Sequence, residues 1–128
     1  MTDRMEKGRA ILRQTLGDDY FTKRQASTTD FNRPLRDMTD ECCFGEAWAI
    51  GPLEPKQCSL LVITMLACLG RVPELRTHLA GAVNNGCSVL EIRHAMMLVA
   101  PYAGIPAGAE GFRSAEIILK EKGLLPTD

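Results

Sequence analysis

The chain has 128 residues and a mass of 14.1 kDa, a length typical of one domain. With 45% hydrophobic residues, 24% charged residues and a net charge of −1, the composition is that of a folded globular protein and excludes intrinsic disorder. The small net charge and the 5% aromatic content also argue against a nucleic-acid-binding surface, which needs cations for phosphates and rings for bases.

Neither a secretory signal nor a membrane span is expected. The first residues, Met1–Glu6, contain no apolar segment, and the longest apolar stretch, Leu60–Leu69, is shorter than a bilayer span requires. The expected location is therefore the cytoplasm. The five cysteines, an odd number without a Cys-x-x-Cys pair, predict no disulfide framework and no zinc ribbon.

Apolar periodicity and capping residues predict helices along almost the whole chain. The expected helices cover residues 3–16, about 29–47, 55–69, 73–84, 89–100 and 106–122. The second of these begins at Thr29 or Asp30, or else at Pro34. The connecting segments are a loop at 17–19, a turn at 50–55 and a loose tail at 124–128. With no strand pattern, the predicted architecture is one all-α domain of about six helices.

Caps define several helix ends. Thr2 or Asp3 caps the first helix, and Ser88 with Glu91 forms a capping box at the start of helix 89–100. Pro101 and Gly104 are expected to end that helix. The helix over 55–69 is apolar on nearly every side, which predicts that it is buried or lies at a subunit interface.

Glu74 and His78 stand four residues apart, which places them on one helical face about one turn apart. A carboxylate in that position can orient an imidazole, hold its tautomer and raise its pKa. Such a pair suits general acid–base catalysis near neutral pH. The spacing is also common in ordinary surface ion pairs, so the spacing alone leaves both interpretations open.

The cysteines have simple structural explanations. Cys42 and Cys43 point about 100° apart on a helix, so one thiol is expected in the core, and a redox role would need a lowered thiol pKa and a nearby base. Cys58, Cys68 and Cys87 are most simply small core residues. The position of Cys58 early in its helix also favours a thiolate there.

Two further residues stand out. His94 lies in the middle of a predicted helix and is expected to be half-exposed and inert. No ligand spacing supports a metal site that includes it. Trp48, the single tryptophan, is expected to anchor the core or an interface, or to form a pocket wall.

Several short blocks follow one another in a recognisable order. They are Ser59-Leu60-Leu61-Val62-Ile63, Glu74-Leu75-Arg76-Thr77-His78-Leu79, Asn84-Asn85-Gly86, Glu91-Ile92 and Tyr102-Ala103-Gly104-Ile105-Pro106-Ala107. In order and spacing they resemble the carboxymuconolactone decarboxylase family over a core of about 30–119, with an N-terminal helix and loop in 1–29. The resemblance implies a single domain over 1–128 with an alkylhydroperoxidase D-like fold. It also implies pockets at subunit contacts in a homo-oligomer, a trimer or hexamer.

The activity implied by the resemblance is cofactor-free loss of CO2 from a small carboxylated lactone in aromatic catabolism, with no metal. This chemistry needs a group that shuttles a proton and donors that stabilise the developing charge. Because Glu74 and His78 match the family's Glu-x-x-x-His pair, the resemblance favours a catalytic role for them, with His78 as the acid/base and Glu74 orienting it. Trp48, Cys58 and Tyr102 are expected to line the substrate pocket.

The chain departs from the family pattern at two positions. The decarboxylases usually carry Trp-x-Arg-Pro-Gly-Leu before the long helix and another Arg just ahead of its Ser-Leu. Here these arginines are replaced by Ile50 and Cys58. Because Arg is the usual partner of a carboxylate, we expect a less anionic substrate or a relative of the founding reaction.

Two alternatives stay open. A thiol-dependent peroxidase of the alkylhydroperoxidase D-like type, with peroxiredoxin activity, would carry Cys-x-x-Cys-x-x-x-His, but its cysteine positions are Arg71 and Glu74 here. One of Cys42, Cys43 and Cys58 would have to take over that role. The other alternative is a non-catalytic protein that binds a small acid or assembles with a partner.

Overall fold

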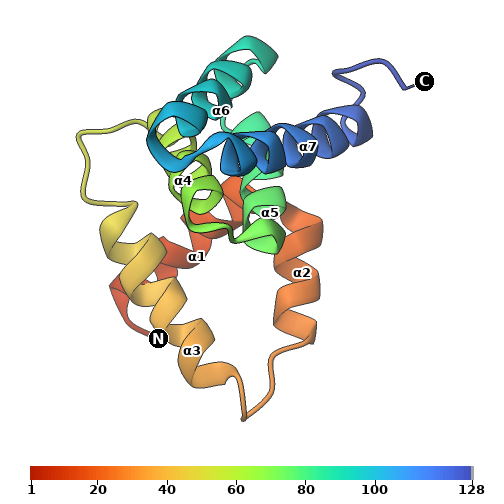
Figure 1. Cartoon of the computed structure of the whole chain (residues 1–128). Helices are drawn as coiled ribbons and strands as arrows, with labels where there is room; N and C mark the ends of the chain where they lie inside the picture. Colours follow the sequence, from red (N-terminus) through yellow and green to blue (C-terminus); the bar gives the residue numbers. More distant parts are fainter. Residues whose placement is uncertain (128) are drawn as a thin grey trace. The chain divides into compact units, whose positions relative to one another are not determined.

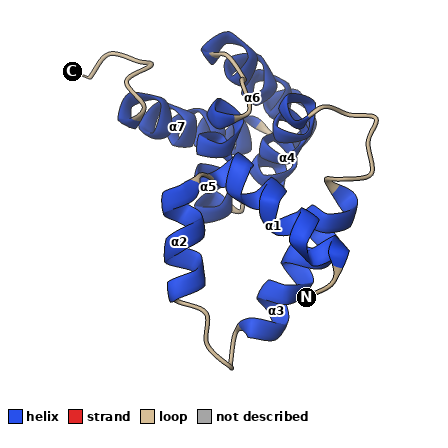
Figure 2. Ribbon diagram, turned by 180° about the vertical axis from the view of Figure 1, so that it is seen from behind, coloured by secondary structure: helices blue, strands red, loops and turns tan. Residues whose placement is uncertain are grey.

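The computed structural model describes residues 1–127, in which every regular element is a helix (Figure 1). Seven α-helices and one π-helix occur in this range, joined by loops and turns (Figure 2). The predicted all-α class is therefore confirmed, and the expected number of about six helices is close. The chain divides into two compact units, Met1–Pro55 and the residues from Lys56 onward. The single domain stays a prediction.

The first unit contains four helices. They are α1 (Asp3–Leu16), α2 (Asp18–Ala26), α3 (Arg33–Met38) and the π-helix η1 (Thr39–Ala47). The predicted cap of α1 is confirmed, because Oγ1 of Thr2 accepts the Met5 backbone N–H at 3.1 Å. Acidic Asp3 and Glu6 in the first turn suit the positive end of the helix dipole.

Helices α1 and η1 lie so close together that both need glycine at the contact. A Cβ atom on Gly8 would lie 1.7 Å from the Asp40 carbonyl oxygen, and one on Gly45 would lie 2.2 Å from the Arg4 carbonyl oxygen. Both distances are far below van der Waals contact, so the two backbones touch directly at these positions. The buried ring of Phe44 lies beside Gly45 in the chain.

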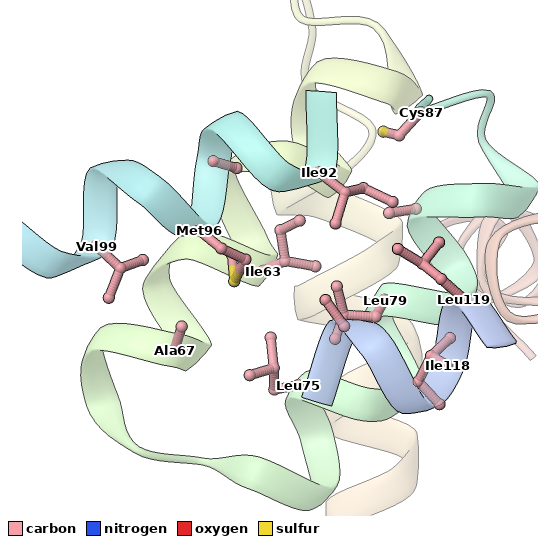
Figure 3. Packing of buried hydrophobic residues seen from close by; sticks show 13 residues of the cluster. Ile63, Ala67, Leu75, Leu79, Cys87, Ile92, Met96, Val99, Ile118 and Leu119 are labelled. Carbon is pink, nitrogen blue, oxygen red and sulfur yellow. The ribbon is translucent and has the colours of Figure 1, made fainter. Parts of the chain in front are cut away.

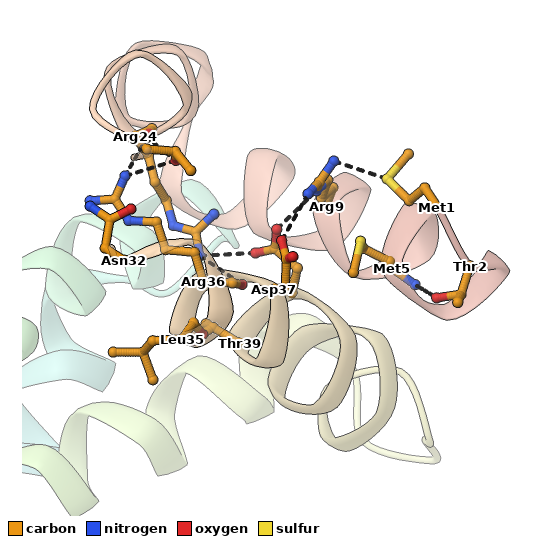
Figure 4. Close-up of polar contacts among 12 residues, drawn as sticks. Met1, Thr2, Met5, Arg9, Arg24, Asn32, Leu35, Arg36, Asp37 and Thr39 are labelled. Carbon is orange, nitrogen blue, oxygen red and sulfur yellow. Dashed lines mark hydrogen bonds and ion pairs between the residues drawn. The ribbon is translucent and has the colours of Figure 1, made fainter. Parts of the chain in front are cut away.

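A buried carboxylate joins three helices of this unit. The Asp40 side chain of η1 is 1% exposed. Its Oδ2 accepts a hydrogen bond from Nε of Arg9 in α1 at 2.9 Å, and its Oδ1 lies 2.9 Å from Nη2 of Arg24 in α2. Figure 4 shows Arg9 and Arg24 extending from their separate helices into this polar cluster. Burying a carboxylate is costly unless it is paired, and Asp40 is paired twice.

The second unit contains four longer helices. They are α4 (Pro55–Leu69), α5 (Val72–Asn84), α6 (Val89–Ala103) and α7 (Ile105–Glu121). Helix α4 has the predicted bounds. The predicted capping box of α6 is confirmed, because Oγ of Ser88 accepts the Glu91 backbone N–H at 3.1 Å and Oε1 of Glu91 accepts the Ser88 backbone N–H at 2.8 Å. Every helix in residues 1–127 is too short or too polar to cross a membrane.

One apolar cluster forms the core of the second unit (Figure 3). Its buried members are Ile63, Ala67, Leu75, Leu79, Ala82, Cys87, Ile92, Ala95, Met96, Val99, Ala115, Ile118 and Leu119. All four helices contribute, so each buries one face on the others. Helices α6 and α7 approach closely at two glycines, since a Cβ on Gly108 would lie 2.8 Å from Cβ of Ala100, and one on Gly111 would lie 2.8 Å from Sδ of Met96.

The predicted loop at 17–19 is wrong beyond its first residue. Asp18 and Asp19 form the first turn of α2, which follows α1 after the single residue Gly17. Glycine permits this sharp turn because its φ of 95° is strained for other residues. The apolar pattern could not indicate α2, because none of its residues is buried.

Two other predicted helices have different bounds. The helix expected over about 29–47 begins at Arg33, later than Thr29 or Asp30 and next to the alternative start at Pro34, and it ends at Ala47 as predicted. From Thr39 it continues as a π-helix, in which the Trp48 backbone N–H bonds to the Cys43 carbonyl at 2.9 Å, five residues back. Pro101 does not end α6, which runs on to Ala103. Pro101 removes the N–H that would bond to the Met97 carbonyl, and only Tyr102 and Ala103 follow it in the helix before the C-cap Gly104.

The tail after α7 is more ordered than expected. The Leu124 backbone N–H donates to the Leu119 carbonyl at 2.8 Å, and Leu125 packs on the core cluster. These contacts correct the predicted loose tail at Leu124 and Leu125. Asp128, the last residue of that prediction, lies outside the described residues.

Candidate functional site

His78 lies on α5 with its position fixed by the core. Leu75 and Leu79 on the same helix are fully buried in the apolar cluster, which fixes the rotation of α5. His78 is half-buried, and its Nδ1 atom is shielded from solvent. Glu74 is exposed in the first turn of the helix, one turn before His78. The pair therefore combines an enclosed imidazole with a solvated carboxylate.

Burial lowers the pKa of His78 below its usual value of 6.5. The direction is opposite to the one expected for an imidazole next to a carboxylate, so that expectation is wrong. Desolvation disfavours the charged imidazolium, and it outweighs any attraction from Glu74. His78 is consequently a neutral imidazole at pH 7, with one nitrogen able to accept a proton and the other able to donate one.

The start of α4, where Cys58 lies, is tied to the loop that follows α5. Nδ2 of Asn85 donates to Oγ of the buried Ser59 at 3.0 Å, and Sγ of Cys87 lies 3.5 Å from the Lys56 carbonyl oxygen. Cys58 is half-buried and lies in the chain between Lys56 and Ser59, which make these two contacts. The structure therefore holds Cys58 on a well-anchored helical turn.

An ion pair fixes the first turn of α6 to the same region. Nζ of Lys56 lies 2.8 Å from Oε2 of Glu91. The hydrogen bond from Lys56, together with the Ser88 backbone N–H, lowers the pKa of Glu91 to about 2. Glu91 is therefore fully ionised at any pH at which the enzyme would be assayed.

A groove runs between α4 and α6. It has a volume of about 400 Å³ and is lined by Leu60, Leu61, Thr64, Glu91, His94, Ala95 and Leu98. His94, which sequence reasoning treated as inert, is exposed and lies in this groove with Glu91. The signal available in the sequence was their i, i+3 spacing on one predicted helix. The groove is mostly apolar and open, so it fits a small organic molecule or an apolar side chain.

The predicted pocket residues are distributed over both units. Trp48 belongs to Met1–Pro55, where its ring stacks on Phe44 with centroids 5.4 Å apart. Cys58 and Tyr102 belong to the other unit, with Tyr102 in the last turn of α6 and 88% exposed. The roles of these residues as pocket walls stay predictions.

The remaining cysteines partly contradict expectation. Cys42 and Cys43 are both exposed, so neither is the predicted core thiol, and Cys68 is also exposed rather than buried. Cys87 is buried as predicted. Desolvation of the thiol, followed by repulsion from Cys42, raises the pKa of Cys43, which reduces its thiolate fraction. This disfavours Cys43 as a peroxidatic nucleophile.

No group of three His, Cys, Asp or Glu side chains within residues 1–127 is arranged to hold a metal ion. An enclosed neutral imidazole one helical turn from a solvated carboxylate is typical of sites that transfer protons. The fold and this arrangement together define a small all-helical protein with a candidate acid–base site on α5.

Comparison with known proteins identifies the family. The sequence pattern of the carboxymuconolactone decarboxylase family matches residues 34–116. The 4-carboxymuconolactone decarboxylase of Acinetobacter baylyi is 30% identical over 123 residues, which cover 96% of this chain and 92% of that protein. Nitrosuccinic acid decarboxylase npaB of Metarhizium robertsii is 33% identical over 105 residues, which cover 82% of this chain and 73% of that protein.

This chain belongs to the carboxymuconolactone decarboxylase family. The resemblance inferred from the sequence blocks is thereby confirmed, and so is the broader expectation of a decarboxylase-like enzyme, since both relatives have names of that kind. The matched range includes Glu74 and His78 and leaves out α1 and α2.

Proposed function

We propose that this protein is a cofactor-free decarboxylase of a small carboxylic acid, in which His78 is the acid/base and Glu74 orients it. The observation that carries the proposal is the half-buried His78, whose pKa is lowered by burial, at the histidine of the family's Glu-x-x-x-His pair. A proton-transfer group works best with a pKa near the operating pH, and a histidine whose pKa lies below 6.5 is in its neutral, proton-accepting form at pH 7.

The two named relatives suggest the class of substrate. One is named for carboxymuconolactone and the other for nitrosuccinic acid, so each acts on a small acid with a carbonyl or nitro group. When the bond to the carboxylate breaks, CO2 leaves and the electron pair stays on carbon, delocalised into that neighbouring group. A proton must then be delivered to that carbon. His78, neutral at pH 7, first takes this proton from solvent, and because burial lowers its pKa the imidazolium so formed gives the proton up readily and returns to the neutral form.

The absent arginines narrow the substrate further. Ile50 is an exposed apolar residue, and Cys58 is a half-buried thiol, so neither offers a cation to a second carboxylate. Each lost charged hydrogen bond would weaken binding of a dianion by about 1.5–3 kcal/mol. We therefore propose a substrate with fewer negative charges than carboxymuconolactone.

The proposal includes assembly into a homo-oligomer. Helix α4 buries Ser59, Ile63 and Ala67 in its own unit and leaves a second apolar row exposed, formed by Leu61, Met65 and Leu69. Helix α6 likewise exposes Met97 and Leu98. Large contiguous apolar surface of this kind is typical of subunit interfaces. Light scattering coupled to size-exclusion chromatography tests it, and a monomer at micromolar concentration would contradict it.

The test of function uses the two histidines of the chain against each other. Wild type, His78→Gln and His94→Gln would be assayed for ultraviolet change and CO2 release with freshly made carboxymuconolactone and with nitrosuccinic acid. We expect His78→Gln to lower kcat/KM about 10²–10⁴-fold on whichever substrate is turned over, as loss of an acid/base group does. His94→Gln should retain most of the activity.

Two results would contradict the proposal. Full activity of His78→Gln would exclude this residue as the acid/base, and loss in His94→Gln alone would move the chemistry to the groove between α4 and α6. Circular dichroism of each variant distinguishes lost chemistry from lost fold. On carboxymuconolactone, wild-type efficiency above about 10⁴ M⁻¹s⁻¹, a value typical of enzymes on their own substrates, would refute the idea of a less anionic substrate.

A further inference from the structure

A basic pocket lies between α2 and α3 in the unit Met1–Pro55. It has a volume of about 290 Å³ and is lined by Tyr20, Lys23, Arg24, Ser27 and Arg36. Three of these five residues are cations, none is acidic, and the other two carry hydroxyl groups. Oγ of Ser27 already donates to the Arg24 carbonyl oxygen at 3.1 Å, so the donors available to a ligand are Lys23, Arg36 and the hydroxyl of Tyr20. With three cations and no acidic residue, the lining has the character of an anion site.

The guanidinium of Arg36 is held in place through its Nη1 atom, and none of the acceptors of that atom is a carboxylate. Its Nη1 donates to the Arg24 carbonyl oxygen, to Oγ of Ser27 at 2.9 Å and to Oγ1 of Thr28 at 3.0 Å. All three acceptors are neutral oxygens. These bonds orient the guanidinium against the end of α2 and leave its positive charge without compensation from them (Figure 4).

Arg24 also has more donor capacity than its surroundings use. Its side chain is 9% exposed, and its Nη2 pairs with Oδ1 of Asp40 at 2.9 Å. Asp40 is shared with Arg9, so one carboxylate serves two guanidinium groups. Nη1 of Arg24 is buried, and no acceptor among residues 1–127 bonds to it. Oδ1 of Asp40 is likewise buried without a hydrogen bond, so both unmatched atoms belong to one buried ion cluster that solvent does not reach. Arg24 therefore adds positive charge at the pocket, and the donors open to a ligand come from the other lining residues.

We propose that this pocket binds a phosphate group, either as inorganic phosphate or as part of a phosphate monoester. A phosphate presents several oxygens in a tetrahedral array, and a phosphate monoester is largely dianionic above about pH 6. This suits three cations and the Tyr20 hydroxyl arranged around one space. A carboxylate offers two oxygens and one charge, which would leave most of these donors unused. The volume of about 290 Å³ leaves room for an organic group beside the ring of Tyr20.

The site is independent of the proposed acid–base chemistry. Its lining residues all lie in Met1–Pro55, whereas His78 and Glu74 lie in the other unit. Residues 20–27 also fall outside the range that matches the family pattern, which begins at residue 34. A phosphate site here is therefore a property of this part of the chain and does not depend on the substrate of the decarboxylase.

The experiment is isothermal titration of the full-length protein at pH 7.5 and low ionic strength. Inorganic phosphate, phenyl phosphate and succinate serve as probes. The first variant is Lys23→Glu, because Lys23 is exposed and its reversal leaves the anchored arginines in place. Lys7→Glu is the matched control, since Lys7 is equally exposed on α1 and is not part of the lining.

We expect saturable binding of inorganic phosphate that weakens at least tenfold in Lys23→Glu and less than twofold in Lys7→Glu. Tighter binding of phenyl phosphate than of inorganic phosphate would support the site and indicate a monoester, and the reverse order would support it and indicate the free ion. If Lys23→Glu fails to fold, Lys23→Gln with a smaller loss of affinity takes its place.

Three outcomes would overturn the proposal. One is the absence of saturable phosphate binding by wild type. Another is an equal loss of affinity in both charge-reversal variants, which would show general electrostatic attraction instead of a site. The third is binding of succinate as tightly as phosphate, which would show that a tetrahedral oxyanion is not what the pocket recognises.

Discussion

Replacing Asp40 by Asn tests whether one buried carboxylate stabilises the unit Met1–Pro55. Asp40 is 1% exposed and contacts Arg9 and Arg24 at 2.9 Å each, so the substitution removes the charge from the centre of a three-helix contact while keeping its shape. Asn can still accept a hydrogen bond from one guanidinium. The substitution also leaves the guanidinium of Arg24, whose side chain is 9% exposed, without a negative charge to pair with.

The structure sets the expected magnitude. Removing one partner of a buried ion pair costs about 3–5 kcal/mol. Arg9 is 27% exposed and can be resolvated by water, so the lower end, about 3 kcal/mol, is expected for Asp40→Asn. Asp37→Asn is the matched control, because Asp37 lies 3.4 Å from the same Arg9 and is 39% exposed. Its loss should cost less than about 1 kcal/mol.

The assay is urea denaturation followed by the fluorescence of Trp48. This is the single tryptophan of the chain, and it stacks on Phe44 within the same unit, so its signal reports on Met1–Pro55. With an m-value of about 2 kcal/mol/M, a loss of 3 kcal/mol lowers the midpoint by about 1.5 M. A shift below about 0.5 M for Asp40→Asn, or equal shifts for both variants, would refute this account of the carboxylate.

Two further predictions concern packing and pH. Gly8→Ala should destabilise the same unit by several kcal/mol, because its Cβ would overlap the Asp40 carbonyl oxygen, and a variant as stable as wild type in the Trp48 assay would contradict this contact. Because burial lowers the pKa of His78 below 6.5, the unfolded chain binds that proton more tightly, and the free energy of unfolding should fall as the pH decreases below about 6.5. The slope should not exceed about 1.4 kcal/mol per pH unit, and it should disappear in His78→Gln and persist in His94→Gln.

The second unit could be predicted well because local and tertiary preferences agree there. Helix α4 begins at a proline in a first-turn position, and the capping box at Ser88 and Glu91 forms as its sequence indicates. Pro101 misleads because α6 continues past it for two residues and ends at the C-cap Gly104, with one backbone hydrogen bond lost to the proline. The helix boundaries of this unit therefore follow the caps and prolines of the sequence, except at the end of α6.

The first unit was predicted less well for a physical reason. No residue of α2 is buried, so the helix has no apolar stripe to detect, and its stability comes from polar contacts such as that of Arg24 with Asp40. The π-helix η1 was also missed. Its register is set by contact with α1 at Gly8 and Gly45, and such tertiary constraints leave no periodic pattern in one sequence.

The candidate site shows the same division. The spacing of Glu74 and His78 placed them on one helix face, but the depressed pKa of His78 follows from burial, which depends on how α5 rotates into the core. Likewise, the groove that contains His94 exists because α4 and α6 lie side by side. Sequence reasoning can name candidate groups, whereas their protonation states require the packed structure.

The missing arginines offer a direct test of how this chain chooses its substrate. Restoring them as Ile50→Arg and Cys58→Arg should improve kcat/KM on carboxymuconolactone about tenfold to a hundredfold for each arginine, since a charged hydrogen bond contributes about 1.5–3 kcal/mol. Ile50→Gln and Cys58→Gln are the controls, because they add polar groups without charge.

The two substitutions differ in how well the structure can accommodate an arginine. Ile50 is exposed and tolerates a long side chain, whereas Cys58 is half-buried on the anchored first turns of α4, so circular dichroism must first show that Cys58→Arg folds. A folded double variant that is no more active on carboxymuconolactone than wild type would show that the two arginines do not explain the difference in substrate. A gain confined to the arginine variants would show that charge at these positions sets the choice of substrate. Specificity is the difference between the affinities for two substrates, and each arginine raises only the affinity for the more anionic acid.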